Sequence, residues 1–258
     1  MSIAIAFSAS KRPEAQEALA VLKKRYGSVS EDSAEVIVAL GGDGAMLDAL
    51  RRRFSDHLPV YGMNRGTVGF LMNEYLVDDL PARIDAAERA HLSPLQMFAT
   101  DIYGETHRAV AINEVSMLRQ TSQTAHLQIT VDGQLRMPEL SCDGVMVATP
   151  AGSTAYNLSA HGPILPIGAN LLALTPVSAF RPRRWKGALL RHDAKVDITV
   201  TAPKLRPVSA SADNLEVRNI AQVSICAERT KALTFCSTLG HRTGRAYPER
   251  TLLILTLQ

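Results

Sequence analysis

The chain has 258 residues, of which 46% are apolar and 21% charged, and its formal net charge is +3. This composition is that of an ordinary globular protein, and so small a charge gives no reason to expect a nucleic acid or a membrane as partner. The three cysteines, Cys142, Cys226 and Cys236, lack the spacing of a metal site. We therefore expect no disulfide framework and a reducing compartment, the cytoplasm.

The first residues read as a strand and lack a basic leader and a long apolar core, so we expect no signal peptide. Apolar stretches near the other end, such as LLILTL, are too short to span a bilayer.

Strands and helices alternate over residues 1–93. Continuous apolar runs predict strands at Ser2–Phe7, Glu35–Leu40 and Pro59–Met63. Apolar residues at helical spacing predict helices at Pro13–Tyr26, around Met46–Phe54 and at Asp79–His91. Because alternating strands and helices build parallel sheets covered by helices, we expect a doubly wound α/β domain over residues 1–93.

The texture changes in the second part of the chain. From Leu95 to Cys236, runs rich in β-branched residues are divided by turn signals, and HLQITVDGQLRM predicts a hairpin that turns at Asp132. We expect an all-β domain over residues 94–236, with a helical insertion near Thr154–Ala160. A final strand is predicted at Thr251–Leu257, and we assign residues 237–258 to the first domain.

A glycine-rich turn, GGDG at residues 41–44, joins the second predicted strand to a helix. Glycine permits positive φ and close approach of a ligand, and the N–H groups at the start of a helix suit a phosphate. A carboxylate such as Asp43 repels phosphate unless it binds a metal, accepts a proton or bonds a hydroxyl. The turn by itself is equally typical of a tight turn in which Asp43 caps the helix.

Two further polar segments follow apolar runs. Asn113 and Glu114 offer donors and acceptors for an amide or for ribose hydroxyls, although such a pair also simply ends a strand. The run DGVMVATPAGSTAYNLSAHGPILP begins at Asp143, an acceptor for an amino group or a hydroxyl. Tyr156 and Ser159 share one helical face in it. A capped short helix explains its Ser and Thr residues but not so many small polar residues beside Asp143.

Taken together, four motifs resemble those of the bacterial NAD kinases: GGDG after a buried strand, GMNRGTVGFL at 62–71, INE at 112–114 and DGVMVATPAGSTAYNLSAHGP at 143–163. Their order and spacing match over nearly the whole chain. GGDG alone is also similar to motifs of diacylglycerol-kinase-like enzymes and phosphofructokinases, whereas GSTAYNLSAHGP is far more specific. The resemblance implies an α/β domain that holds the GGDG turn, a C-terminal β-sandwich and a site between them.

The resemblance also implies roles for individual residues. Asp43 would be the base toward the adenosine 2′-hydroxyl of NAD, with Gly44 beside the phosphates. Asn113 and Glu114 would hold adenine and ribose groups, and Asp143 would face the nicotinamide end. The other residues implied to line the dinucleotide site are Phe70, His126, Thr154, Ala155, Tyr156, Asn157, Leu158 and Ser159.

One position departs from the family pattern. Many members have an arginine, thought to touch phosphate, two residues before the aspartate that matches Asp143, and here that position is Ser141. His126 is one candidate to replace it. The arginines of RPRRWK are others, although that run is also typical of a solvated basic loop: Arg181, Arg183 and Arg184.

The resemblance implies a kinase that phosphorylates NAD to NADP with ATP, accompanied by a divalent metal ion, Mg²⁺, or with polyphosphate as donor. We expect a homo-oligomer, a dimer or a tetramer, without a nucleic-acid or membrane partner. Two alternatives stay open: a lipid or sugar kinase that shares GGDG, and a non-catalytic dinucleotide sensor. The GSTAY block disfavours the first, and Asp43 beside an intact Asn113-Glu114 pair disfavours the second.

Overall fold

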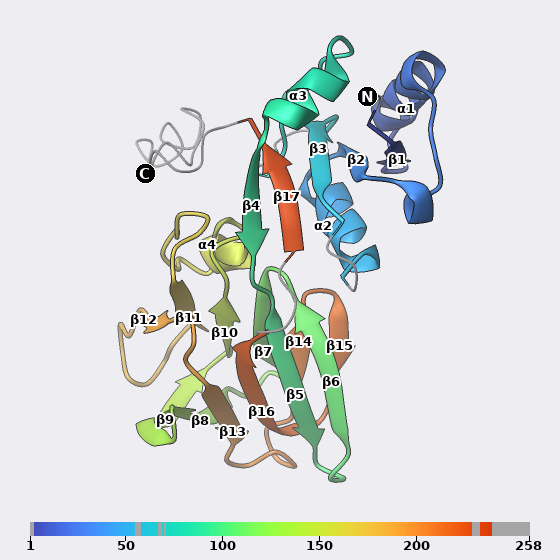
Figure 1. Cartoon of the computed structure of the whole chain (residues 1–258). Coiled ribbons are helices and arrows are strands. Elements are labelled where there is room, and N and C mark those ends of the chain that lie inside the picture. Colours follow the sequence, from blue (N-terminus) through green and yellow to red (C-terminus); the bar gives the residue numbers. More distant parts are fainter. Residues whose placement is uncertain (1–2, 55–57, 67–68, 70, 229–232, 239–258) are drawn as a thin grey trace. The chain divides into compact units, whose positions relative to one another are not determined.

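The computed structural model describes residues 3–54, 58–66, 69, 71–228 and 233–238. The described residues form two compact units, whose elements are labelled in Figure 1. The first unit takes those up to Leu92, Pro166–Gly168 and those from residue 233 onward; the second takes the rest between Ser93 and residue 228. The second predicted boundary, after residue 236, differs from this division, because Leu233–Ser237 is a strand of the first unit.

Five strands build the sheet of the first unit, in the order β1-β2-β3-β17-β4. Their bounds are Ile5–Ala9 for β1, Val36–Gly41 for β2, Val60–Asn64 for β3, Glu88–Leu92 for β4 and Leu233–Ser237 for β17. Neighbouring strands from β1 to β17 are parallel, and β4 is antiparallel to β17. The carboxyl ends of β1, β2 and β3 therefore meet at one edge of the sheet.

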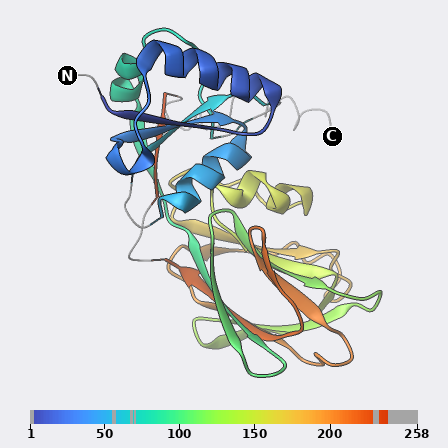
Figure 2. The same ribbon diagram turned by 90° about the vertical axis from the view of Figure 1, so that its right-hand side faces the viewer.

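Helices cover both faces of this sheet, as the doubly wound prediction requires. They are α1 (Pro13–Tyr26), α2 (Asp43–Arg52) and α3 (Leu80–Ala86), with a short 3-10 helix, η1, at Glu31–Ser33. In β2, Val36, Val38 and Leu40 share a core cluster with buried residues of α1 and α3. Helix α2 packs against β2 and β3, and Figure 2 shows α1 and α2 on opposite faces of the sheet.

The predicted helix at Asp79–His91 is wrong in its second half. Helix α3 ends at Ala86, because Ala87 is already extended, and Glu88–Leu92 form β4. This strand pairs with β17, for example Ala90 with Phe235. Pairing with a strand so far along the chain overrides the local helical spacing. The strand predicted at Thr251–Leu257 lies outside the described residues.

The second unit contains two six-stranded antiparallel sheets. One has the order β12-β11-β10-β7-β14-β15, with β7 at Glu114–Arg119, β10 at Gly144–Ala148, β11 at Leu171–Val177, β12 at Ala188–Arg191, β14 at Val208–Ala212 and β15 at Leu215–Val217. The other has the order β6-β5-β16-β13-β8-β9, with β5 at Leu95–Asp101, β6 at Thr106–Ala111, β8 at Ala125–Val131, β9 at Gln134–Cys142, β13 at Val196–Val200 and β16 at Ile220–Ala227. A 3-10 helix, η2 (Gly152–Thr154), and a short helix, α4 (Tyr156–Ser159), follow β10.

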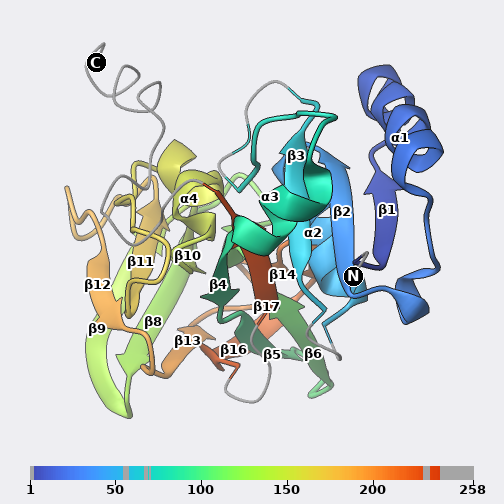
Figure 3. The same ribbon diagram turned by 45° about the horizontal axis from the view of Figure 1, so that its top comes forward.

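Buried residues of both sheets form one hydrophobic cluster, with Met97 and Leu127 from one sheet and Met117 and Val145 from the other. The predicted β-sandwich is therefore confirmed. The hairpin predicted around Asp132 is also present, as β8 and β9, which Figure 3 shows in light green. Among the described residues, no helix is both long and apolar enough to cross a membrane.

Candidate functional site

The glycine-rich turn lies where the carboxyl end of β2 enters α2. Gly41 has φ +153°, and a Cβ atom there would come within 2.8 Å of the Ala45 Cβ and 3.2 Å of Ser10. Only glycine avoids both the strained backbone and the collision. Gly42 precedes α2, and Asp43 is its first residue. The sequence therefore folds here into a tight strand-to-helix turn that exposes the start of a helix.

An open cavity of about 670 Å³ lies over this turn. It is lined by Ser8, Ala9, Ser10, Arg12, Gly42, Asp43, Gly44, Ala45, Asp48, Arg52 and Gly66. The lining residues lie at or just after the carboxyl ends of β1, β2 and β3, directly before α1, and along α2. Helix starts and guanidinium groups both attract anions. The Ser10 hydroxyl is buried and has no hydrogen-bond partner among the described residues. The cavity is therefore suited to a phosphate-bearing ligand.

The Asp43 side chain lies in the wall of this cavity, and its Oδ1 accepts a hydrogen bond of 2.9 Å from the Leu71 backbone N–H. The carboxylate is thus held beside the position that a phosphate would take. Gly44 lines the same cavity, and a Cβ atom at Gly44 would meet open space. Phe70, the predicted adenine contact, lies outside the described residues.

Three of the predicted residues of the second unit, Glu114, Asp143 and Tyr156, interact electrostatically. Burial raises the pKa of Tyr156 above its ordinary value, and the negative charges of Glu114 and Asp143 raise it further. The phenol of Tyr156 therefore experiences the electrostatic field of both carboxylates. Asn113 directly precedes Glu114 at the start of β7. In the β7–β10 ladder, Glu114 pairs with Ala148 at one end and Asp143 lies beside Arg119 at the other, so the polar groups are spread along this strand pair.

Asp143 has a partner that the sequence did not reveal. The Arg119 Nε donates a hydrogen bond of 2.5 Å to the Asp143 Oδ1, and the two side chains are 33% and 36% exposed. The main chains are joined as well, because the Arg119 N–H donates to the Asp143 carbonyl at 2.9 Å. The register of β7 on β10, with Leu118 opposite Gly144, creates this contact. No local motif signals such a register.

Ser141 is only 3% exposed, so its side chain is buried. Its backbone N–H donates a hydrogen bond to the Arg181 carbonyl at 2.8 Å, and its carbonyl accepts one from the Arg181 N–H at 3.1 Å. His126 lies opposite Ser141 in the β8–β9 hairpin, with its Nδ1 4.0 Å from Glu139. The cation observed beside Asp143 is Arg119, rather than one of the candidates expected from the sequence.

Arg181 and Arg183 instead place their guanidinium groups over the Phe180 ring, at 5.8 and 6.0 Å from its centre. Arg184 is exposed and has a positive φ of 62°. The basic run is therefore an exposed loop, as its composition also allowed.

Asn157 does not lie as a ligand contact would. Its side chain is fully buried and donates to the carbonyls of Ser153 at 3.1 Å and Pro163 at 2.9 Å, while its Oδ1 accepts from the Thr175 hydroxyl at 2.7 Å. These hydrogen bonds connect α4 to the residues on either side of it and to β11, so the side chain stabilises the fold of this segment. The other predicted residues of this segment are partly or fully exposed: Thr154, Ala155, Tyr156, Leu158 and Ser159.

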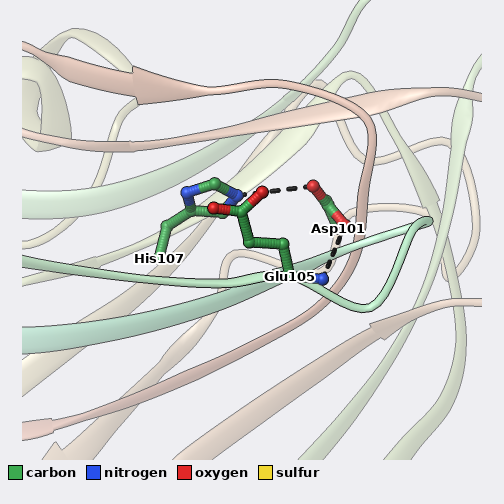
Figure 4. A group of neighbouring side chains, drawn as sticks. All are labelled: Asp101, Glu105 and His107. Carbon is green, nitrogen blue, oxygen red and sulfur yellow. Dashed lines mark hydrogen bonds and ion pairs between the residues drawn. The ribbon is translucent and has the colours of Figure 1, made fainter.

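A polar cluster lies at the β5–β6 hairpin, where Asp101, Glu105 and His107 are close enough to hold a metal ion (Figure 4). The Asp101 carboxylate, however, accepts the N–H groups of Tyr103 at 2.8 Å and Glu105 at 3.0 Å. Although burial acts to raise it, these bonds and His107 hold the pKa of Asp101 below its ordinary value. We interpret this cluster as a turn in which the carboxylate stabilises the hairpin.

Comparison with known proteins assigns both parts of the chain to one family. Residues 6–86 match the ATP-NAD kinase N-terminal domain and residues 112–234 match the ATP-NAD kinase C-terminal domain. The NAD kinase of Hyphomonas neptunium is 69% identical over 248 residues, which cover 96% of each chain. The NAD kinase of Caulobacter vibrioides is 57% identical over 248 residues, covering 96% of this chain and 94% of that one.

Solved structures agree on the fold. The yeast NADH kinase complexed with NADH has a TM-score of 0.83 at 19% identity, and the match covers 99% of this chain and 89% of that chain. An NAD kinase from Archaeoglobus fulgidus in complex with ATP has a TM-score of 0.76 at 21% identity, covering 95% and 98%. At these identities the match concerns the fold alone, whereas the sequence relatives define the family. The chain belongs to the NAD kinase family.

Proposed function

We propose that the enzyme transfers the γ-phosphate of ATP to the 2′-hydroxyl of the adenosine ribose of NAD, with Asp43 as the general base. The observation that carries this proposal is the position of Asp43. Its carboxylate is anchored by the Leu71 N–H in the wall of an anion-attracting cavity at the start of α2. A site that only bound phosphate would gain nothing from a negative charge there.

The chemistry requires a proton acceptor because a secondary alcohol is a weak nucleophile at neutral pH. The Asp43 carboxylate takes the 2′-hydroxyl proton as the new O–P bond forms and the bond from the γ-phosphorus to the bridging oxygen breaks, releasing ADP. General-base assistance of this kind typically contributes ~10²–10⁴-fold. The remainder of the acceleration comes from positioning and from neutralising phosphate charge.

The names of the structural neighbours support the choice of ligands. The yeast protein is an NADH kinase complexed with NADH, and the Archaeoglobus fulgidus enzyme is complexed with ATP. We take ATP as its magnesium complex, because Mg²⁺ neutralises phosphate charge in phosphoryl transfer and Asp48 offers carboxylate oxygens in the lining of the cavity. Polyphosphate is the alternative donor. The family membership argues against a lipid or sugar kinase, and Asp43 argues against a sensor.

Arg12 is proposed to contact the phosphates of the donor. It lines the cavity together with Ser10, whose buried hydroxyl has no partner among the residues that the structure describes. Arg12→Ala should raise KM for MgATP roughly 5- to 50-fold, the loss expected for one charge-assisted hydrogen bond, with KM for NAD nearly unchanged. Lys24→Ala, at an exposed position of α1, the helix that Arg12 precedes, is the control. Equal KM values for ATP in wild type and Arg12→Ala would remove Arg12 from the donor site.

Asp143 is proposed to position NAD, together with Asn113, Glu114 and Tyr156. Asp143→Ala should raise KM for NAD roughly 10- to 150-fold, because a charged hydrogen-bond partner is lost. Asp193→Ala is the matched control, since it breaks an exposed arginine–aspartate pair of 2.6 Å with Arg191. If both variants kept the KM for NAD of the wild type, Asp143 would not contact the dinucleotide.

We also propose that the enzyme works in the cytoplasm and as a homo-oligomer, a dimer or a tetramer. The first proposal is supported by three free cysteines, two of them buried. A reducing compartment keeps thiols in this state.

The test of the proposed function is an assay of purified protein with NAD, MgATP and an NADP-specific dehydrogenase as reporter. We expect NADP formation with MgATP and a loss of activity when EDTA removes the metal. A parallel reaction with polyphosphate identifies the donor: a higher rate than with ATP would assign polyphosphate instead. Absence of NADP with both donors would contradict the proposed function.

A further inference from the structure

The chain reversal that carries Asn113 and Glu114 binds a carboxylate from a distant part of the sequence. Three consecutive N–H groups point at Asp213: the Ile112 N–H donates to its Oδ2 at 2.8 Å, and those of Asn113 and Glu114 donate to its Oδ1 at 2.9 and 3.3 Å. Successive backbone N–H groups of this kind form a concave anion-binding site. Here the anion is supplied by the protein itself.

Asp213 is held in place to do this. It lies between β14 and β15 with a φ of +51°, a conformation that aspartate tolerates better than most residues. Its own N–H donates to the Glu114 carbonyl at 3.1 Å. The next pair in the ladder joins Ala212 and Val115. The carboxylate therefore reaches the reversal from a rigid strand end.

The opposite side of the reversal is fixed by Thr149, which is 2% exposed. Its hydroxyl donates to the Ile112 carbonyl at 2.7 Å, and its N–H donates to the Asn113 carbonyl at 2.9 Å. The same hydroxyl accepts from the Gly152 N–H at 3.1 Å. A Cβ atom on Gly152 would lie 2.1 Å from the Asn113 carbonyl oxygen, so the two segments are in direct contact.

We propose that Asp213 is a positioning residue for NAD, acting through Asn113 and Glu114, with Thr149 as its counterpart on the other side. With both sides of the backbone fixed, the Asn113 and Glu114 side chains start from one orientation before the ligand arrives. Preorganisation of this kind improves binding because less ordering is left to the binding step. The inference rests on the proposed function, in which these two side chains hold adenine and ribose groups.

The test replaces Asp213 by asparagine. The amide keeps one acceptor but turns an NH₂ group toward backbone N–H groups. We expect KM for NAD to rise at least about tenfold, as for loss of a charged hydrogen-bond partner, with KM for MgATP within about twofold, the size of a weak indirect effect. If the role of Asp213 were purely structural, the variant would have a lower melting temperature, but the ratio of its KM for NAD to its KM for MgATP would equal that of the wild type.

Asp132→Asn is the matched control. Asp132 also has a φ of +51° at a hairpin, accepts the Lys195 N–H at 2.8 Å and donates its own N–H to the Lys195 carbonyl at 2.9 Å. This variant should lose a similar amount of stability and keep its KM for NAD. An equal ratio of the two KM values in wild type and Asp213→Asn would overturn the inference.

A second pair of variants decides the matter if Asp213→Asn does not fold. Thr149→Val removes the hydroxyl bond to the Ile112 carbonyl and should raise KM for NAD, whereas Thr149→Ser retains the hydroxyl and should restore it. If Thr149→Val kept the wild-type KM for NAD, the inference would fail. Failure of the proposed function is separate, because the wild-type enzyme would then form no NADP.

Discussion

Asp43→Asn is expected to lower kcat for NADP formation at least about a hundredfold, the lower end of general-base contributions. The amide preserves the shape of the side chain, and its oxygen can still accept the Leu71 N–H that holds Asp43 at 2.9 Å. What it loses is the ability to take a proton. The affinity for NAD, measured by calorimetry, should therefore stay within a few-fold of the wild type.

A large loss of kcat with a nearly unchanged affinity for NAD is the result that identifies a general base. Asp32→Asn is a suitable control, because Asp32 is an exposed carboxylate of the same unit, 2.7 Å from Arg53. It should keep the wild-type kcat. Retention of more than about a tenth of the wild-type rate in Asp43→Asn would leave too little for a general-base term, and Asp43 would then only organise the metal-bound phosphates.

Asn157→Ala should instead destabilise the fold, by about 2–4 kcal/mol. It leaves the carbonyls of Ser153 and Pro163 and the hydroxyl of Thr175 without their buried partner, and each such loss costs roughly 1–3 kcal/mol before the structure relaxes. For a domain of this size the melting temperature should fall by roughly 5–15 °C. Thermal unfolding followed by circular dichroism measures the shift.

The comparison variant is Asn170→Ala, whose side chain is exposed, and it should melt within about 2 °C of the wild type, as surface substitutions do. The same measurement separates two views of Asn157. A variant of normal stability with a tenfold higher KM for NAD would mean that the side chain contacts the dinucleotide after all. The structure leads us to expect the opposite.

Local patterns accounted for the elements that form from neighbouring residues. The apolar run of β2, the proline at the start of α1 and the Asp132 hairpin are each encoded within a few positions, and all appear in the structure. Residues Glu88–Leu92 could not be placed in this way. Their helical spacing is real, but pairing with β17 decides their conformation.

The site shows the same division. The GGDG turn was predictable because glycine has local conformational consequences. The capping role expected of Ser153 and Thr154 was wrong, because the residues that precede η2 and α4 are Ala151 and Ala155 and neither helix has a side-chain cap. Arg119 and Asp213 were missed, since their contacts with Asp143 and with the Asn113 reversal depend on strand register. Asn157 was assigned to the ligand because a polar residue in a functional motif gives no sign of which way it points.

The most direct test of the central claim is the position of the phosphate in the product. The product of NAD and MgATP is purified and examined by two-dimensional phosphorus–proton NMR, which connects each phosphorus atom to the nearest ribose proton. We predict one new phosphomonoester signal, coupled to the proton on C2′ of the adenosine ribose. Coupling to any other ribose proton, or no new phosphomonoester, would contradict the account.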